Sequence, residues 1–213
     1  MSLLDIFIYL GYFLLTINIV IYSIRMKTEN HSYRVLFLYL VYTGIIQILT
    51  EYYGKVYKQN LFMSHYYFIG QFIILSLFYF TLIRNSRIKK FIIIITSLIS
   101  LLLPTLVLPT GTNLNAFNLM EVVICSLPII IYSVVYFFDS VNSQSRKFLF
   151  VNSGIFIYLL CSTLIFVTGN YVKDMETFWF KFIWILNSFL YAISLILFFI
   201  EWYKHFRKKE VAS

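Results

Sequence analysis

Residues 194–200 read Ser194-Leu-Ile-Leu-Phe-Phe-Ile200, and residues 91–96 read Phe91-Ile-Ile-Ile-Ile-Thr96. Neither stretch alternates polar with apolar residues as the ~10-residue strands of a membrane barrel do, so both predict helices. The rest of the chain is similarly apolar: of its 213 residues 61% are hydrophobic and 12% are charged, and the mean hydropathy is +0.83. A soluble domain carries about 25% charged residues. The composition therefore predicts an all-α integral membrane protein.

Seven segments are long and apolar enough to cross a bilayer. A spanning helix needs about 20 predominantly apolar residues to cross the ~30 Å hydrocarbon core. The segments cover about residues 4–24, 35–53, 62–83, 91–108, 116–138, 148–167 and 178–202. They predict a single seven-helix bundle over residues 1–203, followed by a basic tail over residues 204–213. The connecting segments are too short to hold a soluble domain.

The positive charges lie mainly on one side of these segments. Thirteen of the 17 Lys and Arg residues follow the first, third, fifth and seventh segments, and four lie on the other side. Short loops rich in Lys and Arg stay in the cytoplasm, so the N-terminus is predicted outside and the C-terminus inside. The predicted basic cytoplasmic face includes Arg84, Arg87, Lys89, Lys90, Lys204, Arg207, Lys208 and Lys209. Membrane lipid is the expected partner of these charges. Nucleic acid is not expected, because the tail offers few rings on which bases could stack.

Polar residues at helical spacing predict which face of each helix turns toward other helices. Six segments carry such a stripe. That of the first segment is Asp5, Tyr9, Tyr12 and Thr16, and that of the second is Tyr39, Thr43, Gln47 and Glu51. The fourth segment, residues 91–108, has the weakest stripe. It is predicted to lie at the periphery of a six-helix body.

Ionisable side chains at membrane depth single out candidate functional residues, because burying one costs about 2.5–3.5 kcal/mol on insertion scales. Glu121 is the strongest candidate: it lies inside its segment and must be either protonated or paired. Other polar side chains occur in the same, outer half of the bundle and predict a pocket that opens outward. The predicted pocket residues are Glu121, Glu51, His65, Gln47, Gln71, Asn118, Asn187 and Lys181.

Four interpretations of this pocket remain open at the level of sequence. In the first, the charged residues are hydrated at the interface and Glu121 is a neutral, hydrogen-bonded structural group. In the second, Glu121 belongs to a site for a solute, a proton or a cation. In the third, the pocket senses an external molecule and signals to a partner at the basic face. The fourth interpretation is a metal or hydrolytic site, but the sequence contains no H-x-x-x-H or H-E-x-x-H pattern to support it. No catalytic residue, metal or cofactor is predicted.

The layout resembles the 3+1+3 transporter families, which include the SWEET and PQ-loop transporters. The first and fifth segments run in the same direction, and the weakly polar fourth segment occupies the linker position. Four positions in the first half have a similar residue 115 to 116 positions later in the second half. The pairs are Gly54 and Gly169, Lys58 and Lys173, His65 and Lys181, and Gln71 and Asn187. The resemblance implies two parallel three-helix halves joined by a linker helix. It implies no site residues.

Two functions follow as hypotheses. The first is a non-enzymatic sensor or accessory membrane component, coupled to a protein partner or a second copy of the chain at its basic face. The missing catalytic spacing and the short loops favour it. The alternative is a small-solute transporter of 3+1+3 type, with its pocket around Glu121, Gln71 and Asn187. An amino-acid composition rich in Phe, Tyr and Lys and poor in Ala is typical of AT-rich bacterial genomes. It predicts that the protein lies in a bacterial inner membrane.

Overall fold

The computed structural model describes residues 2–107, 118–143, 146–172 and 177–207. These residues form seven α-helices: α1 (Leu3–Arg25), α2 (His31–Val56), α3 (Phe62–Leu82), α4 (Ser86–Val107), α5 (Leu119–Ser143), α6 (Leu149–Val172) and α7 (Thr177–Glu201). A short π-helix, η1 (Trp202–Phe206), continues α7. Each helix overlaps one of the seven predicted segments, but α2 and α4 begin four to five residues earlier, and α5 and α6 end five residues later, than the prediction. The fourth predicted segment ends at residue 108 and the fifth begins at residue 116. Both of these predicted ends lie outside the described residues.

Six helices in the described part of the chain are long and apolar enough to cross a membrane: α1, α2, α3, α5, α6 and α7. They indicate a multi-pass helical membrane protein. The remaining helix, α4, carries Arg87, Lys89 and Lys90 at its start. Its role as a seventh span stays a prediction, and so does the orientation of the bundle.

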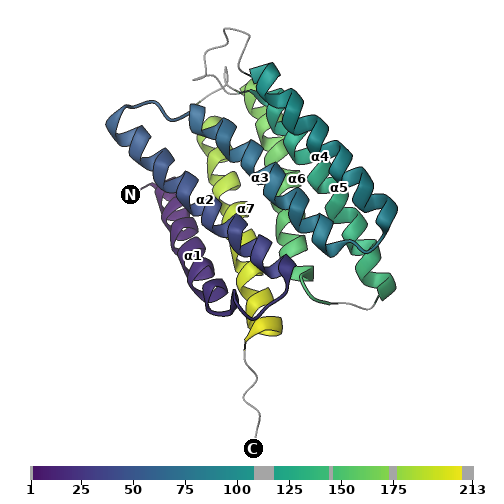
Figure 1. The fold of residues 1–213 in the computed structure, drawn as a ribbon. Coiled ribbons are helices and arrows are strands. Elements are labelled where there is room, and N and C mark those ends of the chain that lie inside the picture. Colours follow the sequence, from purple (N-terminus) through teal and green to yellow (C-terminus); the bar gives the residue numbers. More distant parts are fainter. Residues whose placement is uncertain (1, 108–117, 144–145, 173–176, 208–213) are drawn as a thin grey trace, which may run out of the picture.

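The helices form a ring with α4 on its outside (Figure 1). Within the described residues, α1, α2, α3, α5, α6 and α7 each pack against the next helix in that order, and α7 closes the ring on α1. Helix α4 contacts only α3 and α5, which confirms its predicted peripheral place. Going around the ring in one direction, α1, α2 and α3 come first, and α5, α6 and α7 follow in that order. The 3+1+3 arrangement itself stays a prediction.

Polar residues just before the first two helices define where these helices begin. Ser2 and Asp5 form a capping box at the start of α1: the Ser2 hydroxyl accepts from the Asp5 amide at 3.2 Å, and the Asp5 carboxylate accepts from the Ser2 amide at 2.7 Å. The Asn30 side chain accepts from the Tyr33 amide at 3.0 Å at the start of α2. These side chains satisfy amides that have no partner within the helix.

The inward face predicted for α1 was wrong except at Tyr12, whose hydroxyl donates to Glu51 of α2. Asp5 caps its own helix, Tyr9 is 55% exposed, and the Thr16 hydroxyl donates to the carbonyl of Tyr12 one turn earlier. The residues of α1 that are buried are Gly11, Leu15, Asn18 and Tyr22. Tyr and Thr side chains satisfy their polar atoms locally or at the membrane–water interface, so their polarity alone does not fix the face of a helix.

Buried amide side chains fix the helices to one another. Asn18 on α1 donates to the carbonyl of Leu195 on α7 at 3.0 Å. Asn152 on α6 accepts from the Tyr79 hydroxyl of α3 at 2.7 Å and donates to the Ser133 carbonyl of α5 at 3.1 Å. Each interhelical hydrogen bond in a membrane contributes only about 0.6 kcal/mol on average. Their geometry nevertheless fixes how the helices are rotated.

Helices α6 and α7 lie close together at Gly154. A Cβ atom added to Gly154 would lie 3.0 Å from the carbonyl oxygen of Ser194, and this oxygen belongs to the backbone and cannot turn aside. Small residues at such contacts let the backbones of membrane helices pack tightly. The tight packing positions α7, which carries part of the candidate site.

Candidate functional site

A cavity of about 370 Å³ lies at the end of the bundle that is predicted to face outward. It is called the outer pocket below, and side chains from α1, α2, α3, α6 and α7 line it. Among the described residues that line it, none carries a charge. The polar lining residues are Tyr12, Gln47, Thr50, Asn60, Ser64, Tyr67, Tyr158, Asn187, Ser188 and Tyr191. The volume and the mixed aromatic and polar lining are typical of a site for a small molecule.

Hydrogen bonds connect the wall of the outer pocket to the core of the bundle. Gln47 on α2 donates to the hydroxyl of Tyr191 on α7 at 2.8 Å. Gln71 on α3 donates to the hydroxyls of Tyr39 on α2, at 2.9 Å, and of Tyr67, at 3.0 Å. These hydrogen bonds therefore join α2 to α7 and α2 to α3 beside the pocket.

Asn187 supplies an unused acceptor at the outer pocket. Its side-chain oxygen is buried and makes no hydrogen bond within the described residues. Buried polar atoms in native proteins nearly always have a partner. A ligand or water that donates a hydrogen bond would satisfy this oxygen, so the pocket favours an occupant with a donor group.

Glu121 lies away from the outer pocket, between α3 and α5. Its carboxylate contacts Nδ1 of His65, and the two side chains are only 1% and 10% exposed. The other carboxylate oxygen, Oε1, is buried without a hydrogen-bond partner in the described part of the chain. The Glu121 backbone amide donates to the side chain of Asn118 at 3.3 Å. The sequence required Glu121 to be protonated or paired, and here it is paired with His65.

Two of the predicted pocket residues lie at the surface. Glu51 has a 42% exposed side chain, 2.8 Å from the ammonium group of Lys55, and it accepts from the Tyr12 hydroxyl at 3.4 Å. Lys181 is exposed as well. The predicted pocket residues thus fall into three places: Gln47, Gln71 and Asn187 at or behind the outer pocket, His65, Glu121 and Asn118 between α3 and α5, and Glu51 and Lys181 at the surface.

Helix α3 forms a wall shared by the two buried places. Ser64 and Tyr67 line the outer pocket, and His65 contacts Glu121 on α5. Neighbouring residues on a helix point about 100° apart, so Ser64 can face the outer pocket while His65 faces Glu121. A rotation or shift of α3 would therefore change the outer pocket and the His65–Glu121 pair together.

The sequence analysis missed Glu201, at the end of α7. Its fully buried carboxylate accepts from the backbone amides of Phe148 at 2.5 Å and Phe150 at 2.9 Å, and lies 2.8 Å from Nδ1 of His205. Glu201 thus caps the start of α6 from α7. An acidic residue at the end of a long apolar segment, four residues before a histidine, was the available signal.

The basic residues at the other end of the bundle are mostly exposed. Arg84, Arg87, Lys90, Lys204 and Arg207 are exposed, whereas Lys89 is half-buried with its ammonium group 5.2 Å from the centre of the Phe80 ring. Lys208 and Lys209 lie outside the described residues. This surface, called the basic end below, is opposite the outer pocket along the bundle.

In the described ranges, no group of three His, Cys, Asp or Glu side chains is placed to hold a metal ion. Comparison of the chain with models of protein families, with characterised proteins and with solved structures finds no match.

Proposed function

We propose that this chain is a membrane sensor or accessory component that binds a small neutral molecule in the outer pocket and passes the binding event to a partner at the basic end. The outer pocket carries this proposal, because its described lining residues are uncharged and come from five helices. A charged ligand would be desolvated there without a partner, at a large cost. A neutral molecule with an apolar body and a hydrogen-bond donor matches the aromatic lining and the free Asn187 oxygen.

Helix α7 offers a route from the outer pocket to the basic end. Asn187 and Tyr191 lie at the pocket, and ten residues beyond Tyr191, or about 15 Å along the helix, Glu201 holds the start of α6. A ligand that favours one position of α7 would therefore also shift the start of α6. A ligand acts in this way when its affinity differs between two packing states of the helices.

A small-solute transporter is the second candidate, and the His65–Glu121 pair is the observation that favours it. Buried ionisable pairs at membrane depth commonly mark proton or ion pathways. Because α3 carries residues of both the outer pocket and the pair, solute binding and proton binding could be linked through it. In this function the pair would take up and release a proton as the solute moves.

Ligand binding can be measured through Trp184, which lines the outer pocket. We expect the fluorescence of protein in nanodiscs to change on titration with at least one member of a panel of neutral solutes, such as monosaccharides, amino-acid amides and short quinone analogues. Tyr191→Phe removes one hydroxyl from the pocket and is expected to weaken binding about 3- to 10-fold, the value of one hydrogen bond. Tyr203→Phe, at the exposed basic end, is the matched control and should leave the affinity unchanged.

Solute uptake into proteoliposomes then distinguishes the two functions. A sensor binds the solute without flux. A transporter gives flux that Glu121→Gln abolishes while binding to the outer pocket persists. The proposal of a ligand site fails if no solute binds, or if Tyr191→Phe and Tyr203→Phe bind equally well.

A further inference from the structure

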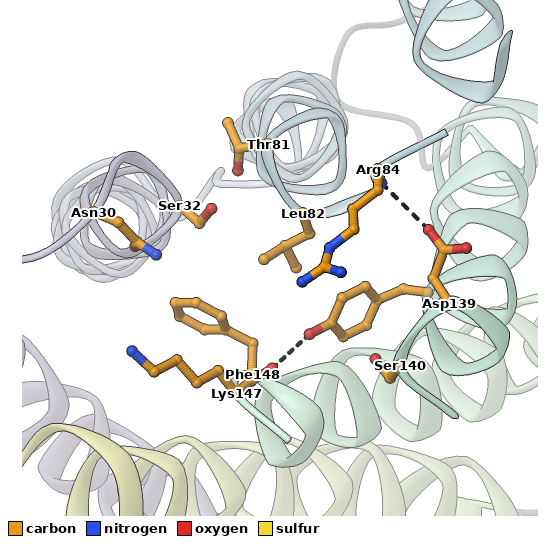
Figure 2. A pocket seen from close by; sticks show the side chains of 10 residues that line it. Asn30, Ser32, Thr81, Leu82, Arg84, Asp139, Ser140, Lys147 and Phe148 are labelled. Atoms are coloured by element: carbon orange, nitrogen blue, oxygen red, sulfur yellow. Dashed lines mark hydrogen bonds between the residues drawn. The ribbon is translucent and has the colours of Figure 1, made fainter. Parts of the chain in front are cut away.

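A second cavity, of about 260 Å³, lies at the basic end of the bundle (Figure 2). It is called the inner cavity below. The start of α2, the end of α3, helix α5 and the turn before α6 enclose it. Its polar walls include Ser32, Arg84, Tyr136, Asp139, Ser140 and Lys147. Among the described residues, none lines both this cavity and the outer pocket.

Two cationic side chains line the inner cavity without an acidic partner. Within the described residues, no carboxylate lies within 4.0 Å of the Arg84 guanidinium or the Lys147 ammonium group. Asp139 lines the same cavity, but it accepts from the Arg84 backbone amide at 3.3 Å, and the guanidinium turns away from it toward the cavity in Figure 2. The three side chains leave a net charge of +1, which favours an anion.

The backbone that carries Lys147 is held in place from two sides. The Tyr136 hydroxyl donates to the Lys147 carbonyl at 2.5 Å, and the next amide, of Phe148, donates to Glu201 at 2.5 Å. The amide of Arg84 is bound to Asp139 as described above. Hydrogen bonds therefore hold the backbone of both Arg84 and Lys147 in place. Binding of a ligand between them costs less backbone entropy than it would if these residues lay on a free loop.

Buried hydroxyls also line the inner cavity. Ser140 is 4% exposed, and its hydroxyl lies beside that of Tyr136. The Ser32 hydroxyl lies in the opposite wall and is buried as well. Hydroxyls beside an arginine and a lysine are the donors that phosphate oxygens require, since each such oxygen accepts several charge-assisted bonds.

We propose that the inner cavity binds a phosphate group, carried either by a lipid headgroup or by a small water-soluble ester. Its volume suits a phosphate and a short alcohol. A phosphate bound between Arg84 and Lys147 connects the end of α3 to the start of α6. Occupancy therefore locks the two sides of the ring together at the basic end.

The test uses the full-length purified protein and two probes. The first is dioleoylphosphatidylglycerol, counted as retained molecules by native mass spectrometry. The second is glycerol 3-phosphate, whose binding is followed by the shift in Tm at constant ionic strength. We expect saturable binding to the wild type, about tenfold weaker binding in Arg84→Gln, and about 100-fold weaker binding in the double variant Arg84→Gln/Lys147→Gln.

The double variant Lys27→Gln/Arg87→Gln is the matched control, because it removes the same charge from exposed positions that do not line the inner cavity. It should bind within twofold of the wild type. Arg84→Lys keeps the charge and should bind better than Arg84→Gln, which separates a binding role from a structural one. The Tm of each variant without ligand shows whether it is folded.

Binding of both probes supports a phosphate site that is open to water, and binding of the lipid alone supports a headgroup site. The proposal is overturned if neither probe binds the wild type. It is also overturned if the cavity double variant and the control double variant bind equally well.

Discussion

Replacing Glu201 with alanine is expected to lower the free energy of unfolding by about 3–5 kcal/mol, because each buried amide left without its acceptor costs about 1–3 kcal/mol. The substitution leaves two amides, of Phe148 and Phe150, without their acceptor and removes the carboxylate beside His205. Glu201→Gln keeps one carbonyl acceptor and should lose less. Unfolding by sodium dodecyl sulfate in mixed micelles measures the loss.

Glu51→Ala is the matched control for this prediction. Glu51 also contacts a basic residue four positions away, but its side chain is 42% exposed. Exposed ion pairs contribute at most about 1 kcal/mol, so its loss should be small. Equal losses for Glu201→Ala and Glu51→Ala would show that Glu201 does not hold the start of α6.

The His65–Glu121 pair should show strong energetic coupling in a double-mutant cycle. His65→Leu leaves the Glu121 carboxylate buried without its partner, and Glu121→Leu removes the carboxylate from His65. Each single variant is expected to lose about 3–5 kcal/mol of stability. The double variant should lose about 2–3 kcal/mol less than the sum of the two single losses, and this difference is the coupling, because leucines can fill the same space.

The same unfolding titration measures this cycle, and the exposed Glu51–Lys55 pair is its control, with an expected coupling below about 1 kcal/mol. A coupling as small as the control's would mean that the two side chains do not stabilise each other. The double variant is also informative about function. If the wild type gives flux and the folded double variant binds solute without flux, the pair serves transport, and if binding and downstream effects are unchanged, the pair is structural.

Much of the fold was predictable because the bilayer imposes a simple rule. Every spanning segment must satisfy its backbone internally, so long apolar runs such as residues 189–200 form helices. The peripheral place of α4 followed from its weak polar stripe. Polar spacing did not predict the inward face of α1, because Tyr9 is exposed and the Thr16 hydroxyl bonds to a carbonyl of its own helix.

The grouping of the candidate site residues was not predictable from the sequence. Gln47 and Asn187 were expected near the outer end, and they line the outer pocket. His65 and Glu121 were expected at the same depth, yet the rotation of α3 and α5 places them on another interface. Helical spacing shows which residues share a face, but the partner of that face depends on packing between segments more than 50 residues apart.

The proposed function requires the outer pocket to open on the outer side of the membrane, a claim that cysteine accessibility tests. The two native cysteines, Cys125 and Cys161, are first replaced with alanine, and Ser188→Cys then places a single thiol in the wall of the outer pocket. Arg207→Cys, at the basic end, is the control. A membrane-impermeant methanethiosulfonate should modify Ser188→Cys in right-side-out vesicles and Arg207→Cys only in inside-out vesicles. Modification of Ser188→Cys only in inside-out vesicles, or in neither preparation, would contradict the claim.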